Sequence, residues 1–174
     1  MIRKCIFCLL YLAALVANAE VTQVDARYFV SEHRIPISAS PGKVWRALTE
    51  DVAQWWDATH SYSGNAENFH LEARAGGCFC EIYESGSIEH MRVVLARTNL
   101  ELRMHGGLGP LQSMGVAGAM TFALEKTETG TLLNYKYAVT GAGGEALAGA
   151  VDRVQLGQLQ RLQRYAEGGN ASGQ

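Results

Sequence analysis

Hydrophobic and polar positions alternate along most of the second half of the chain. Within short segments the apolar side chains recur at every second position, which is the period of a half-buried β-strand. The segments with this pattern or with strand composition are 27–37, 69–74, 78–83, 87–97, 100–105, 115–126 and 131–140. Turn pairs such as Gly76-Gly77, Ser85-Gly86 and Thr129-Gly130 separate most of the later ones. Short links between consecutive strands predict an antiparallel meander.

The period becomes helical in two places. Ser40 followed by Pro41 is typical of a helix N-cap with proline at the first helical position, and a second short helical piece ends at Trp55-Trp56. After the segment 141–144, which is GAGG, a helical period continues to about residue 167. At 100° per residue its apolar side chains fall within one arc. The arc contains Leu147, Ala150, Val151, Val154, Leu162 and Tyr165.

This order of elements predicts an α+β fold. A sheet with one apolar face must be covered, and the last helix is the only element long enough to cover it. We therefore expect a helix-grip fold, in which a curved antiparallel sheet of about seven strands wraps around the long C-terminal helix, with two short helices after the first strand. Glycines inside or beside the strands favour bends and leave space. An apolar pocket between sheet and helix is the expected result.

The N-terminus has the three-part pattern of a secretion signal. A basic start, Arg3-Lys4, precedes the apolar run 5–16, and small residues occupy 17 and 19. The run is too short to span a bilayer comfortably. We predict a signal peptide over 1–19, one domain over 20–174, a periplasmic or secreted location, and no stable membrane insertion after cleavage.

Charge and cysteine content narrow the expected partners. The chain has 15 basic and 17 acidic residues, and no run of like charges stands out, so we expect no nucleic-acid partner. Cys78 and Cys80 remain after cleavage, two positions apart in a predicted strand. Regular strand geometry separates their Cα atoms by roughly 6.5–7 Å, at or beyond the upper end of disulfide spacing. We predict two small buried thiols, with a disulfide as the alternative in an oxidising compartment.

Motifs for cofactors and metals are weak. Gly141-x-Gly143-x-x-Ala146 superficially matches a dinucleotide fingerprint, but the chain ends after the helix and lacks the further strand that this site needs. We therefore expect no cofactor. The five histidines match no standard zinc spacing. No metal is expected, and a site assembled across strands from His70, His90 and Glu81 is the alternative.

Catalytic candidates are Glu81, Glu89 and His90. A carboxyl group desolvated in an apolar pocket has a raised pKa and can act as a general acid or base. The alternative is that both glutamates face water. No serine lies in a nucleophile-elbow motif.

Ligand-binding candidates combine apolar bulk with a few polar groups. Aromatic and methionine side chains suit an irregular pocket, although they serve equally well as core. Gln158 lies near the centre of the apolar arc, where its amide would need a partner if buried, or would be wet if the helix overhangs the sheet. The candidates are Trp55, Trp56, Met91, Met104, Met120, Tyr135, Tyr137 and Gln158.

Several segments together resemble START-like proteins, the SRPBCC superfamily. They are 35–49 (IPISASPGKVWRALT), Trp55-Trp56, 75–81 (AGGCFCE), 89–94 (EHMRVV), 107–111 (GLGPL), Gly130-Thr131 and the terminal amphipathic helix. The nearest branch in pattern is that of polyketide-cyclase-like and Hsp90-ATPase-activator-like bacterial proteins. The resemblance implies a deep cavity that binds lipids, sterols, polyketides or other apolar molecules, with enzymes in a minority of branches.

These observations favour an exported protein that binds a hydrophobic small molecule. The first alternative is a cyclase or hydrolase that uses a cavity carboxylate or histidine. The second is a protein-interaction module whose interior is filled. An export signal counts against an Hsp90 co-chaperone role, since that partner and its ATP are not found outside the cytoplasm.

Overall fold

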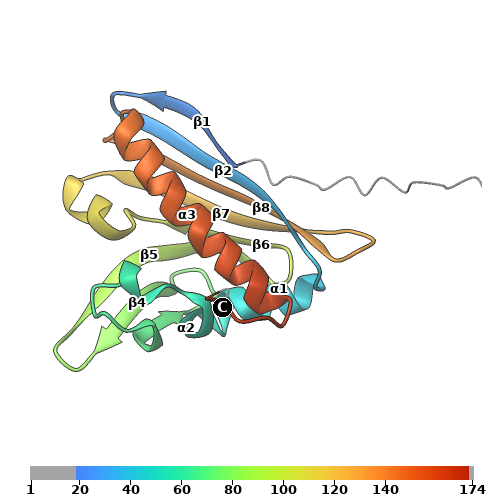
Figure 1. Ribbon diagram of the computed structural model, residues 1–174. Helices are drawn as coiled ribbons and strands as arrows, with labels where there is room; N and C mark the ends of the chain where they lie inside the picture. The colour runs from blue at the N-terminus through green and yellow to red at the C-terminus, as the bar shows by residue number, and fades with distance from the viewer. Residues whose placement is uncertain (1–18, 173–174) are drawn as a thin grey trace, which may run out of the picture.

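The computed structural model describes residues 19–172 of the 174-residue chain. The expected signal peptide therefore lies outside the described residues except for Ala19. An eight-stranded antiparallel sheet curves beneath one long helix, which crosses its face diagonally (Figure 1). The predicted helix-grip fold is confirmed.

The elements follow the predicted order. The strands are β1 (Ala19–Asp25), β2 (Tyr28–Ile37), β3 (Phe69–Leu71), β4 (Cys78–Tyr83), β5 (Gly86–Arg97), β6 (Glu101–His105), β7 (Ala117–Lys126) and β8 (Thr131–Thr140). The α-helices are α1 (Pro41–Thr49), α2 (Val52–Trp55) and α3 (Glu145–Ala166), and the 3₁₀ turns are η1 (Ala58–His60), η2 (Ala66–Asn68) and η3 (Gly109–Met114). The strands lie in the order β1-β2-β8-β7-β6-β5-β4-β3. The meander β3–β8 therefore ends beside β2, and α3 follows β8, the third strand from the β1 edge.

Strand β1 is one more than the sequence predicts. It pairs with β2, from Ala19 opposite His33 to Asp25 opposite Tyr28. Its residues 22–25 are all exposed. An edge strand without a buried face has no reason to alternate, so periodicity does not reveal it.

Helix α1 begins as expected. The Ser40 hydroxyl accepts a hydrogen bond from the Lys43 backbone N–H, and Pro41 is the first helical residue. Val44, Trp45 and Leu48 are buried against the rest of the core. Helices α1 and α2 thereby close one end of the space between the sheet and α3.

Strand β5 contains an irregularity that changes the β4–β5 pairing. Phe79 lies opposite Met91, but Cys80 lies opposite Glu89, so His90 is the extra residue of a bulge. Consecutive residues of a regular strand face opposite sides, whereas a bulge allows two neighbours to share a side. His90 and Met91 are accordingly both buried.

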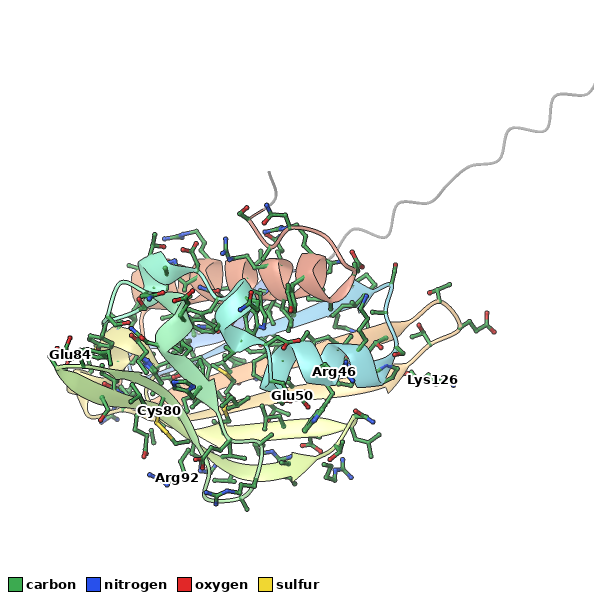
Figure 2. All side chains as sticks on the ribbon, turned by 90° about the horizontal axis from the view of Figure 1, so that it is seen from below. Arg46, Glu50, Cys80, Glu84, Arg92 and Lys126 are labelled. Carbon is green, nitrogen blue, oxygen red and sulfur yellow. A yellow bond between two sulfur atoms is a disulfide. The ribbon has the colours of Figure 1, made fainter. Side chains whose placement is uncertain are left out.

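The cysteine prediction is wrong. Cys78 and Cys80 form a disulfide, with their Cα atoms 5.5 Å apart, and Cys80 is labelled beside its yellow sulfur bond in Figure 2. The regular-strand spacing of 6.5–7 Å that argued against the bond does not hold next to the bulge. Periodicity alone cannot reveal this local shortening.

Within residues 19–172, none of the helices combines the length and the apolar character that crossing a membrane requires.

Candidate functional site

A cavity of about 400 Å³ lies between the sheet and the N-terminal half of α3. Helix α3 supplies one wall, formed by Leu147, Ala150, Val151, Val154 and Gln155. Leu147, Val151 and Val154 are only half-buried. Part of the apolar arc predicted from the sequence therefore borders an unfilled space, while Leu147 and Val151 also contact the core on one side.

The opposite walls come from two loops and from the sheet. Residues 59–62 follow α2, and residues 108–111 lead into and form the first part of η3. Trp56, His90 and Tyr137 complete the lining. Among the described residues that line this cavity there is no aspartate, glutamate, lysine or arginine. The lining is therefore mostly apolar with a few polar groups, a composition typical of small-molecule pockets.

Tyr137 fixes the loop that forms one wall. Its hydroxyl donates to the Gly106 carbonyl (3.1 Å) and accepts from the Leu108 backbone N–H (3.0 Å). Burial raises the pKa of Tyr137 to about 12, against the lowering effect of the Leu108 hydrogen bond. A Cβ at Gly118 would lie 2.8 Å from the Tyr137 ring, so only glycine leaves room for the ring there. Tyr137 is thus a neutral structural anchor at the cavity wall.

Glu81 and His90 form a buried pair beside the cavity. Glu81 Oε1 lies 2.8 Å from His90 Nε2, and the side chains are 0% and 2% exposed. Burial alone raises the pKa of Glu81, but hydrogen bonds from Ser63, Tyr62 and His90 outweigh it and lower that pKa below the ordinary value. Burial lowers the pKa of His90, although Glu81 acts in the opposite direction. At neutral pH the pair is a carboxylate and a neutral imidazole.

The charge state of this pair fixes the tautomer of His90. A carboxylate only accepts hydrogen bonds, so Nε2 carries the proton and Nδ1 keeps a free lone pair. No described residue bonds Nδ1. The His90 ring also stacks on Phe69, with centroids 5.2 Å apart and planes 19° apart. An oriented neutral histidine backed by a carboxylate can serve as a hydrogen-bond acceptor or as a base.

Glu81 also holds the loop at the cavity mouth. Its two oxygens accept the backbone N–H groups of Tyr62 (2.9 Å) and Ser63 (2.8 Å). The Tyr62 hydroxyl then donates to the Gly109 carbonyl at 3.0 Å. This chain of contacts joins the two loops that border the cavity.

Gln155 is the polar residue of α3 at the cavity, and the sequence analysis did not select it. Its side-chain oxygen accepts a hydrogen bond from the Tyr135 hydroxyl at 2.7 Å, and the residue is 5% exposed. Gln158, which was selected, is also buried, but its oxygen accepts the Asp57 backbone N–H at 3.0 Å. Both residues lie within the buried stripe of α3, but at 100° per residue Gln155 falls just outside the predicted apolar arc and Gln158 inside it, which is why counting positions selected Gln158.

The remaining ligand-binding candidates divide into three groups. Trp56 and Tyr137 line the large cavity. Trp55, Met104, Met120 and Gln158 line a gap of only about 20 Å³ in the core, which Trp56 and Gln155 also border. Met91 and Tyr135 are buried but line neither space. Binding by these side chains stays a prediction, and their positions favour Trp56 and Tyr137.

Glu89 and His70 lie away from the cavity. Glu89 is exposed and pairs with Arg92, and His70 is exposed on β3. In the described part of the chain, the group with metal-ligand spacing is Cys78, Cys80 and Glu89, whose two sulfurs are joined in the disulfide. The alternative metal site of His70, His90 and Glu81 is not assembled.

A second buried histidine joins α3 to β2. His33 Nε2 lies 3.0 Å from Asp152 Oδ1, and the Ser31 hydroxyl donates to the same oxygen at 2.6 Å. Ser31 Oγ is also 3.1 Å from His33 Nε2. Serine and carboxylate therefore meet the same ring nitrogen, whereas a catalytic triad places them on opposite nitrogens. This group is a tie between elements.

Comparisons by sequence return no relative. No family model matches this chain, and no curated protein is similar to it at a significant level.

Comparisons by structure identify the fold. A conserved protein of unknown function from Enterococcus faecalis is similar with a TM-score of 0.62 and 16% identity, over 88% of this chain and 78% of that one. The Aha1 structure from Colwellia psychrerythraea has a TM-score of 0.56 and 20% identity, over 79% of this chain and 96% of that one. DynU16, a protein of the dynemicin biosynthetic locus, has a TM-score of 0.60 and 20% identity, over 82% of this chain and 49% of its own length.

These likenesses are consistent with a START-like, helix-grip fold and show the fold alone. This chain spans about half the length of DynU16. Fold does not determine function, which must be argued from the site.

Proposed function

We propose that this chain is an exported protein that binds a hydrophobic small molecule in the cavity between the sheet and α3. The observation that carries the proposal is the apolar arc of α3, with Leu147, Val151 and Val154 half-buried around about 400 Å³ of unfilled space. Cores of proteins are normally packed without voids of this size. Export is supported by the sequence pattern of residues 1–19.

Apolar burial supplies enough free energy for useful binding. A ligand and cavity wall that together bury about 500 Å² of apolar surface gain about 12 kcal/mol at 25 cal/mol per Å², and about 8 kcal/mol of this must remain for micromolar binding. The loss of translational and rotational freedom reduces this gain. Affinities in the micromolar range are therefore expected for a well-fitting apolar ligand.

The test compares a filled cavity with an intact one. Val151→Trp places an indole in the cavity, whereas Gln160→Trp adds the same ring at an exposed position of α3. Native mass spectrometry of protein from its own compartment should show an apolar adduct on the wild type and on Gln160→Trp, but not on Val151→Trp. Equal adducts on all three proteins, or no apolar ligand at micromolar concentration from a lipid panel, would refute the proposal.

The same preparation tests export. If the chain is cleaved after Ala19, the measured molecular mass should be that of a chain that begins at Glu20. If the mature protein instead has the mass of the full chain from Met1, the proposal of export is refuted.

The Glu81–His90 pair favours a second candidate, an enzyme acting on the bound molecule. His90 Nδ1 would be the base once its ring or a neighbour moves, because this nitrogen is sealed from the cavity in the structure, and Glu81 would orient the ring through Nε2. Turnover of an identified ligand should then fall about 100-fold or more in His90→Phe, as for loss of a general base. Unchanged turnover would leave simple binding. The protein-interaction alternative predicted a filled interior, and the cavity counts against it.

A further inference from the structure

The amide of Gln155 has unused hydrogen-bonding capacity at the cavity. Its oxygen is engaged by Tyr135, and no described residue accepts a hydrogen bond from its nitrogen. The Gln155 nitrogen also keeps some accessible surface. Among the described residues, the side-chain polar atoms that are both fully sealed and without a partner are His33 Nδ1 and His90 Nδ1. Gln155 is 95% buried and borders both the large cavity and the gap of about 20 Å³, so the surface that its NH₂ group keeps faces one of these spaces, and the large cavity is the one with room for a ligand. A bound molecule with an acceptor oxygen would satisfy it.

The electrostatic surroundings disfavour an anionic ligand. Two carboxylates lie just behind the walls, Glu81 behind His90 and Asp152 on α3 beside Val151. The cavity itself has no lysine or arginine, and the nearest ones, Arg153, Arg161 and Arg164, line an adjoining depression that shares His60 and Val154 with the cavity and also contains Asp57. His60 is the remaining basic side chain, on the exposed rim. A buried carboxylate without a cation pays a large desolvation cost.

The other polar groups inside do not offer a competing donor. The Tyr137 hydroxyl already donates to the Gly106 carbonyl. The proton of His90 is used by Glu81. The side-chain donors of Trp56, Thr59, Ser61 and Tyr62 are also bonded within the chain, so among the described lining residues Gln155 is the side-chain donor left for a ligand in the interior.

We infer that the bound molecule is uncharged and presents a carbonyl oxygen to the amide of Gln155, as a ketone, ester or amide does. This inference rests on the proposed function and specifies its ligand class. Free carboxylic acids of the same skeleton are poor ligands at neutral pH.

Three naphthalene probes of nearly equal size separate the effect of a carbonyl oxygen from that of apolar burial and from that of a negative charge. They are 2-acetylnaphthalene, which has the carbonyl, 2-ethylnaphthalene, which lacks it, and 2-naphthoate, which replaces it by a carboxylate. Equilibrium dialysis with the mature wild-type protein at pH 7.5 gives each Kd from probe fluorescence. The ketone should bind about 3- to 10-fold more tightly than the ethyl compound, as for one neutral hydrogen bond. Naphthoate should bind at least about 10-fold more weakly than the ketone.

A matched pair of glutamine variants locates the effect. Gln155→Met keeps the length of the side chain and removes the amide, so the ketone should lose its advantage over the ethyl compound. Gln158→Met changes the other buried glutamine of α3, which does not line the large cavity, and should keep the advantage. If Gln155→Met does not fold because the Tyr135 hydroxyl loses its partner, the three probes on the wild type decide the question.

The outcomes distinguish this inference from the proposed function. Equal Kd values for ketone and ethyl compound, or naphthoate as the tightest probe, would overturn the inference and leave apolar binding intact. An advantage that survives in Gln155→Met would also overturn it. No binding by any of the three probes would remove the proposed function, and the inference with it.

Discussion

The two halves of α3 use similar side chains in different ways. In the C-terminal half, Leu159, Leu162 and Ala166 are at most 2% exposed and belong to the hydrophobic core. In the N-terminal half, Leu147 and Val151 are half-buried and border the cavity. Helices α1 and α2 lie beside the C-terminal half of α3 (Figure 1) and both contact it. The presence of a cavity therefore depends on which neighbours a helix meets as well as on its own hydrophobicity.

Both halves of α3 are fastened by hydrogen bonds, but the C-terminal half is also packed more closely. Asp152 ties the N-terminal half to β2 through Ser31 and His33, and Gln155 ties it to β8 through Tyr135. The C-terminal half has polar ties as well, from Gln158 to the Asp57 backbone and from Arg161 to the Trp55 carbonyl, and it adds the close packing of Leu159 and Leu162. Directional polar contacts hold a helix at a fixed position without filling the volume beside it. The cavity can persist because hydrogen bonds, rather than close packing, secure the helix above it.

The largest expected difference between the two halves of α3 is the loss of stability when an apolar side chain is shortened to alanine. Leu162→Ala should lower the free energy of unfolding by about 2–5 kcal/mol, because it leaves a hole in a packed region. Val151→Ala should cost less than about 1 kcal/mol, because its side chain already faces open space. Urea denaturation of both variants measures the two values. Similar losses would mean that the N-terminal half is packed as tightly as the other.

Removing the hydrogen bonds of Asp152 to β2 should have an intermediate effect on the free energy of unfolding. Asp152→Ala leaves the buried Ser31 hydroxyl and His33 without their acceptor, so the free energy of unfolding should fall by about 1–3 kcal/mol. Arg153→Ala is the adjacent control, and its exposed side chain should contribute within about 0.5 kcal/mol. Equal values from the same denaturation experiment would show that Asp152 does not fasten the helix.

The smallest effect is a dependence of stability on pH. Burial lowers the pKa of His33 and of His90, in each case against the raising effect of the partner carboxylate. Below the unfolded-state value of about 6.5, the unfolded chain binds more protons than the folded one. The free energy of unfolding should therefore decrease as pH falls below about 6.5 and should be constant just above it.

The measurement is the urea midpoint between pH 7.5 and 5.5. His33→Gln should reduce the pH dependence, while the exposed residue His70 provides the control variant His70→Gln. The lowered pKa of Glu81 adds a further loss only at more acidic pH, below about 4.5. A midpoint that rises as the pH falls would contradict the assignment of buried neutral histidines.

Much of the fold could be predicted because each element carries its own period. The alternation in β5 to β8 and the cap at Ser40 are local properties, and all were read correctly. Strand β1 was missed because its exposed residues 22–25 have no buried face to mark. Trp56, Tyr137 and His90 were named in advance and do line the cavity.

The details of the site could not be predicted in the same way. The bulge at His90 turns that side chain inward and is accompanied by the closer spacing of Cys78 and Cys80. A single extra residue in a ladder changes which side chains meet, and periodicity does not record it. Gln155 and Gln158 likewise share one face of α3, and only the position of the 57–62 loop separates their roles.

The sequence by itself determined the order of strands and helices, the apolar arc of α3 and the expectation of a space beneath it. The tertiary structure alone decided that Glu81 meets His90, that Gln155 rather than Gln158 faces the large cavity, and that only half of α3 is packed. The physical reason is that periodicity is set by neighbours along the chain. Pairing, burial and unfilled volume depend on residues far apart in sequence, such as the 101 positions between Asp57 and Gln158.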